Sequence, residues 1–266
     1  MRLFLHLPGF AAAFLAAVCF CANLCGAPQA PLASTSEDAQ PVAPPPAAVL
    51  TPQQRGDLYM ARKMFREAID VYRTAMTGVQ DHILYNKIGI AYQHMENLGS
   101  AKKSYNEALK LNSKYSEARN NLGTLAYERK DFNGAIREYN RALLLNPSSA
   151  TTYSNLGTAY FARKRYEDAA KAYQQAVKLD PEVFDSQGTA GTILQERTVE
   201  ERAKFHYFMA KTYAEAGMTE RALTSIRKAL EEGFKDRKKF LEEPAFAALQ
   251  EMPEFKQIIA SEPRVL

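Results

Sequence analysis

One segment of about 34 residues recurs along this chain. An Ala, followed four residues later by Tyr and seven residues later by a second Ala, occurs four times, and a Gly stands twelve residues before each first Ala. The first alanines are Ala68, Ala101, Ala135 and Ala169, and the glycines are Gly56, Gly89, Gly123 and Gly157. A fixed period of this length is typical of small units that bury their apolar faces only by stacking on one another.

Each unit has the pattern of two amphipathic helices of about 13 residues, joined by a short turn such as Arg129-Lys130-Asp131. Gly inside a helix costs about 1 kcal/mol relative to Ala. A Gly at one phase of every first helix is therefore explained if bare backbone lets the second helix approach closely. The recurring Ala serves the same purpose on the second helix, and we expect the Tyr rings to fill the space beside it.

The Leu-Gly, Tyr, Ala, aromatic, Ala and Pro positions of this unit resemble those of the tetratricopeptide repeat family. The resemblance implies an all-α, right-handed solenoid of about five helix-turn-helix repeats with a helical C-terminal cap. Four units span residues 51–183. A fifth, at residues 203–236, departs from the pattern with Ala210 where Gly is usual and Ile226 where Tyr stood, while Tyr213, Gly217, Ala222 and Ala229 stay in register.

An insertion at residues 184–202 separates the fourth and fifth units. Its glycines indicate a loop, and Thr198 followed by Glu201 is a capping-box signature, which predicts a helix start near Val199. Two interpretations of the insertion stay open: a surface loop, or a flap over the binding surface.

The C-terminal segment, residues 237–266, has the pattern of short helices broken at Pro244 and Pro253. An open stack of helix pairs leaves an apolar end exposed to water. We therefore expect this segment to cap the stack with its apolar side chains, which are Phe240, Leu241, Phe246, Leu249, Phe255 and Ile258.

The first 27 residues have the pattern of a secretory signal. Arg2 precedes an apolar run, and no acidic residue occurs before Glu37. A retained membrane anchor and a buried N-terminal helix are the alternatives. Residues 28–50 are rich in Pro and Ala and predict a disordered linker. We expect a bacterial exported protein, periplasmic or associated with the envelope.

The cysteines bear on a lipid anchor. Cys19, Cys21 and Cys25 are the only three in the chain, and each follows a large apolar residue where a lipoprotein signal would have a small one. A lipid anchor is therefore the less favoured alternative, and we expect contact with a membrane only through the N-terminal segment.

The sequence contains no pattern typical of catalysis or cofactor binding. It has no nucleophile motif, no phosphate-binding Gly-rich loop and no His spacing suited to a metal, and we expect His206 to be a packed helix residue. The net charge is +4, with Lys and Arg dispersed among Asp and Glu, which argues against nucleic acid as a partner. We expect a non-enzymatic protein with no catalytic residue, cofactor or metal.

The resemblance places the first helix of each unit on a concave face that binds a protein or an extended peptide. Carried over by register, the candidate residues are Asn86, Ile90, Gln93, His94, Asn120, Asn121, Thr124, Tyr127, Glu128, Ser154, Asn155, Thr158 and Phe161. This set is rich in amides and poor in charge, which suits a peptide better than a phosphate backbone. The Lys and Arg residues with which one family subtype clamps a chaperone carboxylate are missing, so we expect no such clamp.

The sequence therefore predicts an interaction scaffold without enzymatic activity. The alternative function is a membrane-tethered factor of envelope or pilus assembly, resembling a lipoprotein. Lipid on one of the three cysteines would favour the alternative, and a cleaved, periplasmic form would favour the simple scaffold.

Export is testable directly. Expressed in a bacterial host with its own N-terminus, the chain should leave the cytoplasm, because a basic start followed by an apolar run directs secretion. Cell fractionation with immunoblotting measures this. Full-length protein found only in the soluble cytoplasmic fraction would contradict the prediction.

Overall fold

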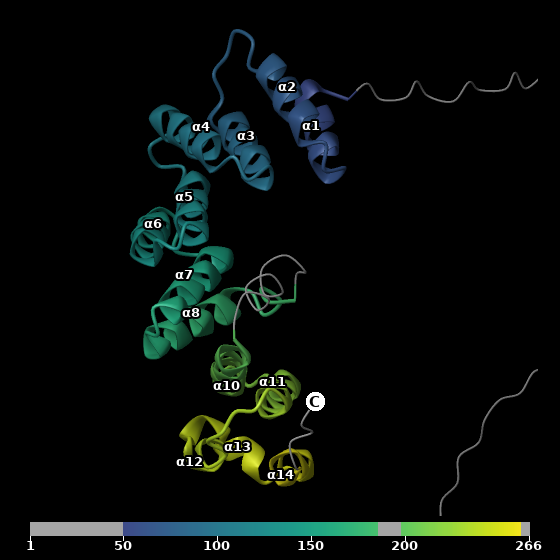
Figure 1. The fold of residues 1–266 in the computed structure, drawn as a ribbon, viewed down its shortest axis with the longest axis vertical. Coiled ribbons are helices and arrows are strands. Elements are labelled where there is room, and N and C mark those ends of the chain that lie inside the picture. Colours follow the sequence, from purple (N-terminus) through teal and green to yellow (C-terminus); the bar gives the residue numbers. More distant parts are fainter. Residues whose placement is uncertain (1–49, 186–197, 262–266) are drawn as a thin grey trace, which may run out of the picture. The chain divides into compact units, whose positions relative to one another are not determined.

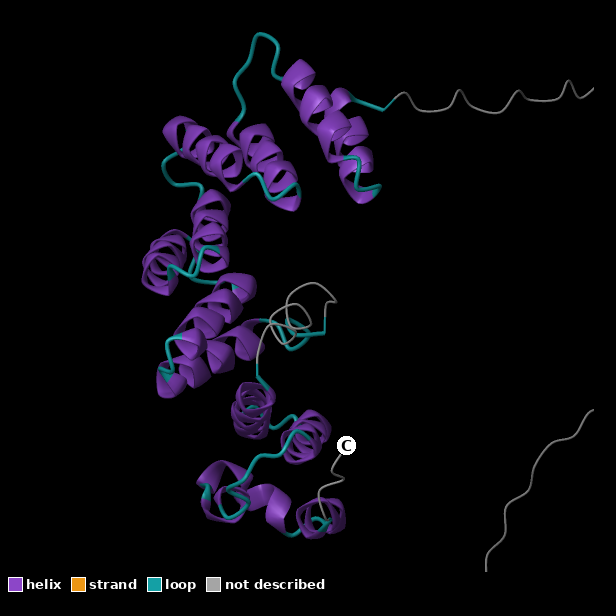
Figure 2. Cartoon of the chain, viewed as in Figure 1, coloured by secondary structure: helices purple, strands orange, loops and turns teal. Residues whose placement is uncertain are grey.

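The computed structural model describes residues 50–185 and 198–261 (Figure 1). The signal predicted at residues 1–27, almost all of the linker, most of the insertion and residues 262–266 lie outside this range. Residues 48–266 form one compact unit. Within the described residues every regular element is a helix, which confirms the all-α fold class (Figure 2).

Five helix pairs follow one another along the described chain. The pairs are α1 (Pro52–Ala61) with α2 (Phe65–Ala75), α3 (His82–His94) with α4 (Leu98–Leu111), α5 (Ser116–Glu128) with α6 (Phe132–Leu145), α7 (Ala150–Ala162) with α8 (Tyr166–Leu179), and α10 (Val199–Glu215) with α11 (Thr219–Glu231). The two helices of each pair pack on each other, and the second helix of each pair also packs on the first helix of the next. This is the neighbour-on-neighbour stacking of a helical solenoid.

The close approach within the first four pairs depends on glycine. A Cβ added to Gly56, Gly89, Gly123 or Gly157 would lie only 2.3–2.6 Å from the nearest ring atom of the Tyr on the second helix. Carbon atoms in contact normally lie about 3.5–4.0 Å apart. The rings of Tyr72, Tyr105, Tyr139 and Tyr173 are at most 2% exposed, so they have little room to move away.

In the fifth pair, different residues occupy the two positions that are Gly and Tyr in the other pairs. Ala210 replaces the Gly and Ile226 replaces the Tyr, and both side chains are fully buried. Ile has no ring, so the Cβ that would meet Tyr in the other pairs has space here. The two departures from the repeat pattern are thus one coupled exchange.

The turn inside each pair contains one residue in the left-handed region of backbone conformation. In the first four pairs this residue is not glycine: φ is 59° at Lys63, 57° at Glu96, 60° at Lys130 and 58° at Lys164. The fifth pair has Gly217 there, with φ 72°. Glycine adopts this conformation without the strain that a Cβ brings.

The chain after the fifth pair covers its open side. Its elements are α12 (Lys239–Glu242), the 3₁₀ helix η1 (Pro244–Phe246), α13 (Ala247–Gln250) and α14 (Pro253–Ala260), and the two prolines stand at element starts as expected. Phe240, Phe246, Leu249, Phe255 and Ile258 join the core cluster that α10 and α11 build. Leu241 was expected to do the same, but it is 53% exposed because it points away from that core.

Two predictions about α10 are confirmed. The helix begins at Val199, and the Thr198 hydroxyl and the Glu201 side chain each bond the other residue's backbone N–H in a capping box. His206 is packed, being only 9% exposed. Burial lowers the pKa of His206 to about 4, aided by Lys228 and Arg202. Glu232 Oε2 lies 3.6 Å from His206 Nε2, and the other Glu232 oxygen is held by Arg202.

Gly123→Ala should lower the free energy of unfolding by about 1–3 kcal/mol, because its Cβ would overpack the Tyr139 ring. Adding Tyr139→Ile should restore much of the loss, since this pair of residues is the one found in the fifth unit. Gly99→Ala is the control, because its Cβ would meet nothing closer than 4.0 Å. Chemical denaturation measures all three variants. Equal losses in the single and double variants would refute the proposed coupling.

Acid should destabilise the fold through His206. The pKa of His206 is about 4 in the folded protein and has its ordinary value of 6.5 in the unfolded chain. The unfolded chain therefore binds the proton first as the pH falls. The free energy of unfolding should therefore drop between pH 6.5 and 4, by at most about 3 kcal/mol from this group. His206→Gln should flatten this part of the pH profile. A wild-type slope retained in His206→Gln would contradict the assignment.

Candidate functional site

A chain of asparagine amides crosses the first helices of three successive units. Asn155 Nδ2 on α7 donates to Asn120 Oδ1 on α5 at 3.0 Å. Asn120 Nδ2 in turn lies 3.3 Å from Asn121 Oδ1, and Asn121 Nδ2 donates to Asn86 Oδ1 on α3 at 2.9 Å. The amides therefore link neighbouring units. We call the solvent-facing side of α3, α5 and α7, which includes Asn120, Asn121 and Asn155, the first-helix surface.

Further polar groups on this surface are held in place from both sides. Tyr105 donates its hydroxyl hydrogen to Gln93 Oε1 at 2.7 Å, and Gln93 Nε2 donates to Glu128 on the next unit. The Tyr139 hydroxyl lies 3.3 Å from Thr124 Oγ1. Burial raises the pKa of the Tyr105 and Tyr139 hydroxyls, so both keep the proton that they donate. The rotamers of Gln93 and Thr124 are thereby fixed.

Four of the predicted site residues lie in the interior. Asn86, Ser154, Thr158 and Phe161 are each at most 6% exposed. Thr158 Oγ1 bonds the Ser154 carbonyl oxygen at 3.0 Å, and the Phe161 ring packs 5.9 Å from that of Phe205 on the next unit. Packing against other helices covers these four side chains, so the accessible groups belong to the remaining candidates.

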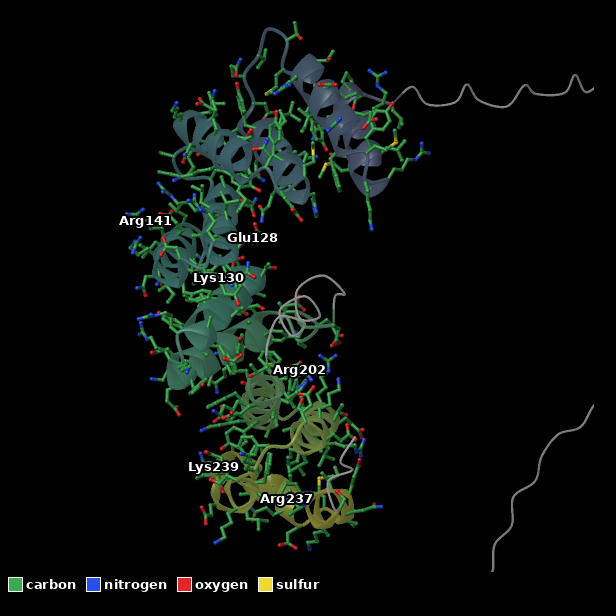
Figure 3. All side chains as sticks on the ribbon, in the orientation of Figure 1. Glu128, Lys130, Arg141, Arg202, Arg237 and Lys239 are labelled. Carbon is green, nitrogen blue, oxygen red and sulfur yellow. The ribbon has the colours of Figure 1, made fainter. Side chains whose placement is uncertain are left out.

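The other predicted residues are open to solvent in part or in full. Ile90, Gln93, Asn120, Asn121, Thr124, Tyr127 and Asn155 are half-buried, and His94 and Glu128 are exposed. His94 stacks on Phe65 with ring centroids 4.9 Å apart. Nine of the thirteen candidates, all on α3, α5 and α7, thus remain accessible to solvent, and Figure 3 labels one of them, Glu128.

Sequence reasoning missed the ion pair that continues this surface to the first unit. Lys87 Nζ lies 2.6 and 2.8 Å from the two carboxylate oxygens of Asp57, which also accepts from the Tyr72 hydroxyl at 2.6 Å. The repeat pattern could have revealed this position, because Asp57, Thr124 and Thr158 all follow the repeat Gly by one residue. In three units the buried Tyr hydroxyl reaches this position, whereas in the second unit Ile90 stands there and Tyr105 reaches Gln93 instead.

Two hollows of the described chain lie elsewhere. One, of about 730 Å³, is lined mainly by α4 residues and by Arg119. The other, of about 270 Å³, lies between α10, α11 and the turn after α8, and its lining includes Phe205, Met209 and Tyr213. The first-helix surface is therefore suited to contact along its length rather than to enclosing a small molecule.

Within the described residues no cluster of His, Cys, Asp and Glu could hold a metal ion. No helix in the same part of the chain is both long and apolar enough to cross a bilayer. The first-helix surface offers amide, hydroxyl and aromatic groups. These groups can donate and accept hydrogen bonds and cover apolar area.

Comparison with solved structures finds helical repeat proteins. The structure titled "Crystal structure of MamA" is 22% identical with a TM-score of 0.46, over 69% of this chain and 96% of that one. "Crystal structure of APC/C hetero-tetramer Cut9-Hcn1" is 21% identical with a TM-score of 0.48, over 78% and 35%. "Crystal structure of YrrB: a TPR protein with an unusual peptide-binding site" is 18% identical with a TM-score of 0.44, over 69% and 86%. A search of curated proteins found no match.

The sequence itself matches models of one family in three places. Residues 83–115 and 150–183 match the tetratricopeptide repeat, and residues 124–162 match the TPR repeat. These ranges fall on the helix pairs α3–α4, α5–α6 and α7–α8, where the Gly–Tyr contact recurs. The chain is a tetratricopeptide-repeat protein.

Proposed function

We propose that this protein is a non-enzymatic scaffold that binds an extended segment of a partner protein along the first-helix surface. Stacked helical repeats commonly present such extended surfaces for protein binding. The partner would lie across α3, α5 and α7, in contact with Asn121, Asn155, Thr124 and Tyr127.

The observation that carries this proposal is the hydrogen-bonding capacity left in the asparagine chain. A side-chain amide has two N–H donors and an oxygen with two acceptor sites. Asn121 and Asn155 each use one N–H in bonds to the preceding unit, and the Asn155 oxygen accepts from no group in the described chain. Both residues are half-buried, so their remaining groups stay within reach of a ligand.

These fixed amides suit a peptide backbone. A backbone offers one N–H and one C=O per residue whatever its side chains. An amide already held by its neighbour loses little rotamer freedom on binding, which favours affinity. Tyr127, whose ring lies 5.2 Å from that of Phe132, would add apolar contact beside the amides.

We also propose that this binding occurs outside the cytoplasm. The support is the sequence of the first 27 residues, with a basic start and an apolar run before any acidic residue. The export experiment given above tests this part independently of binding.

Asn121→Ala combined with Asn155→Ala should weaken binding by roughly 1–3 kcal/mol, at about 0.5–1.5 kcal/mol for each lost hydrogen bond. The probe is a peptide selected on the immobilised full chain by phage display, and calorimetry measures its affinity. Thermal melts run in parallel, because the same change also removes two bonds between units.

Asn86→Ala is the matched control. It breaks the same chain of amides, but Asn86 is 6% exposed and cannot reach a ligand. It should therefore lower the melting temperature and leave the affinity nearly unchanged. If Asn86→Ala weakens binding as much as the double variant does, the amides only join the repeats and the proposal fails.

A further inference from the structure

The turns inside the helix pairs concentrate positive charge. Each turn has three residues between its two helices, and the turns of the first, third and fourth pairs contain an Arg-Lys sequence. The basic residues are Arg62, Lys63, Arg129, Lys130, Arg163, Lys164 and Arg165, and all seven are exposed. Because these turns occupy one repeat position, they lie at the same end of successive helix pairs, and Figure 3 labels Lys130 in one of them.

The lysines stand at the strained position of these turns. Lys63, Lys130 and Lys164 have φ between 58° and 60°, a conformation that Gly adopts freely and a side chain does not. The fifth pair, whose turn Ala216-Gly217-Met218 has no charge, uses Gly217 there. Strained residues that persist where an unstrained choice exists point to a use beyond folding.

Most of these cations have no acidic partner within the described chain. Arg62, Lys63, Arg129, Lys130, Arg163 and Lys164 make no ion pair there, and only Arg165 does, with Asp168 at 2.8 Å. Asp131, in the third turn, is committed to capping α6 through the Gly134 N–H at 2.8 Å. Glu200 is near enough for Lys164 to lower its pKa, but its hydrogen bond to Lys204 is the main cause.

The other end of the same helix pairs contains few cations. The connections between successive pairs at residues 76–81, 112–115, 146–149 and 180–185 contain Asp81, Asp180, Glu182 and Asp185, against Lys114 alone. The acids at this end are thus confined to the connections after the first and fourth pairs, and Arg221 pairs with Glu182 and Asp185.

We propose that the basic turns, residues 62–64, 129–131 and 163–165, dock this protein on an anionic membrane surface. These exposed turns carry long cationic side chains, and lipid phosphates attract Lys and Arg. Neither of the two hollows described above includes a turn residue. The first-helix surface is not involved, and docking leaves it free for a partner.

Vesicle sedimentation with the full chain tests the proposal. One vesicle type is phosphatidylcholine alone, and the other has equal parts phosphatidylcholine and phosphatidylglycerol. The ratio of the two partition coefficients isolates the electrostatic contribution, because the apolar N-terminal segment contributes to both. Wild type should prefer the anionic vesicles at low salt and lose the preference at high salt.

The edge variant combines Arg129→Gln, Lys130→Asn, Arg163→Gln and Lys164→Asn. Asn tolerates the left-handed region, so the fold should survive, as circular dichroism would show. The preference for anionic vesicles should fall about tenfold or more, since each cation near such a surface contributes about a fivefold factor.

The control variant removes the same number of charges from second helices, with Gln at Lys102, Lys103, Lys171 and Lys178, all exposed and without an ion pair in the described chain. It should keep most of the preference. An equal loss in both variants, or none in the edge variant, overturns the proposal. Wild type that binds polyglutamate but not anionic vesicles also overturns it, in favour of an acidic protein partner.

Discussion

The contact between a backbone glycine and a tyrosine ring is the interaction on which the rest of this structure depends. It recurs in four helix pairs, with no room for even a methyl group between backbone and ring. Because it sets how closely the two helices of a pair approach, it also sets which side chains remain on the surface. The exchange for Ala210 and Ile226 in the fifth pair shows that what the fold requires is the combined volume of the two residues, rather than either residue itself.

Contacts between the pairs are more varied than contacts within them. The Asp57–Lys87 ion pair joins the first and second units, and asparagine amides join the second, third and fourth. Aromatic rings such as Phe161 and Phe205 join the fourth and fifth. Polar links leave donors and acceptors at the surface, whereas aromatic links bury their groups. The proposed partner-binding surface coincides with the amide-linked units, where groups that join the repeats also remain accessible.

The two proposed surfaces are different parts of the same repeat. One consists of first-helix side chains that bond the neighbouring unit, and the other consists of turns whose cations, apart from Arg165, make no ion pair in the described chain. A solenoid can separate such roles because each repeat position forms its own line along the stack. Membrane docking through the turns and partner binding along the first helices would not compete for the same residues.

Much of this protein could be predicted from sequence, because its strongest interactions recur at a fixed spacing. The period, the helix pairs, the Gly–Tyr contact and the capping box at Thr198 all follow from residues close in the chain or in equivalent positions. The accessibility of single side chains could not be predicted. Asn86, Ser154, Thr158 and Phe161 lie on first helices beside more exposed neighbours, and packing against other helices covers them. The charge distribution also depends on tertiary structure. Lys and Arg are dispersed along the sequence, but stacking brings residues about one repeat apart to the same end of the helix pairs, so the basic turns gather there.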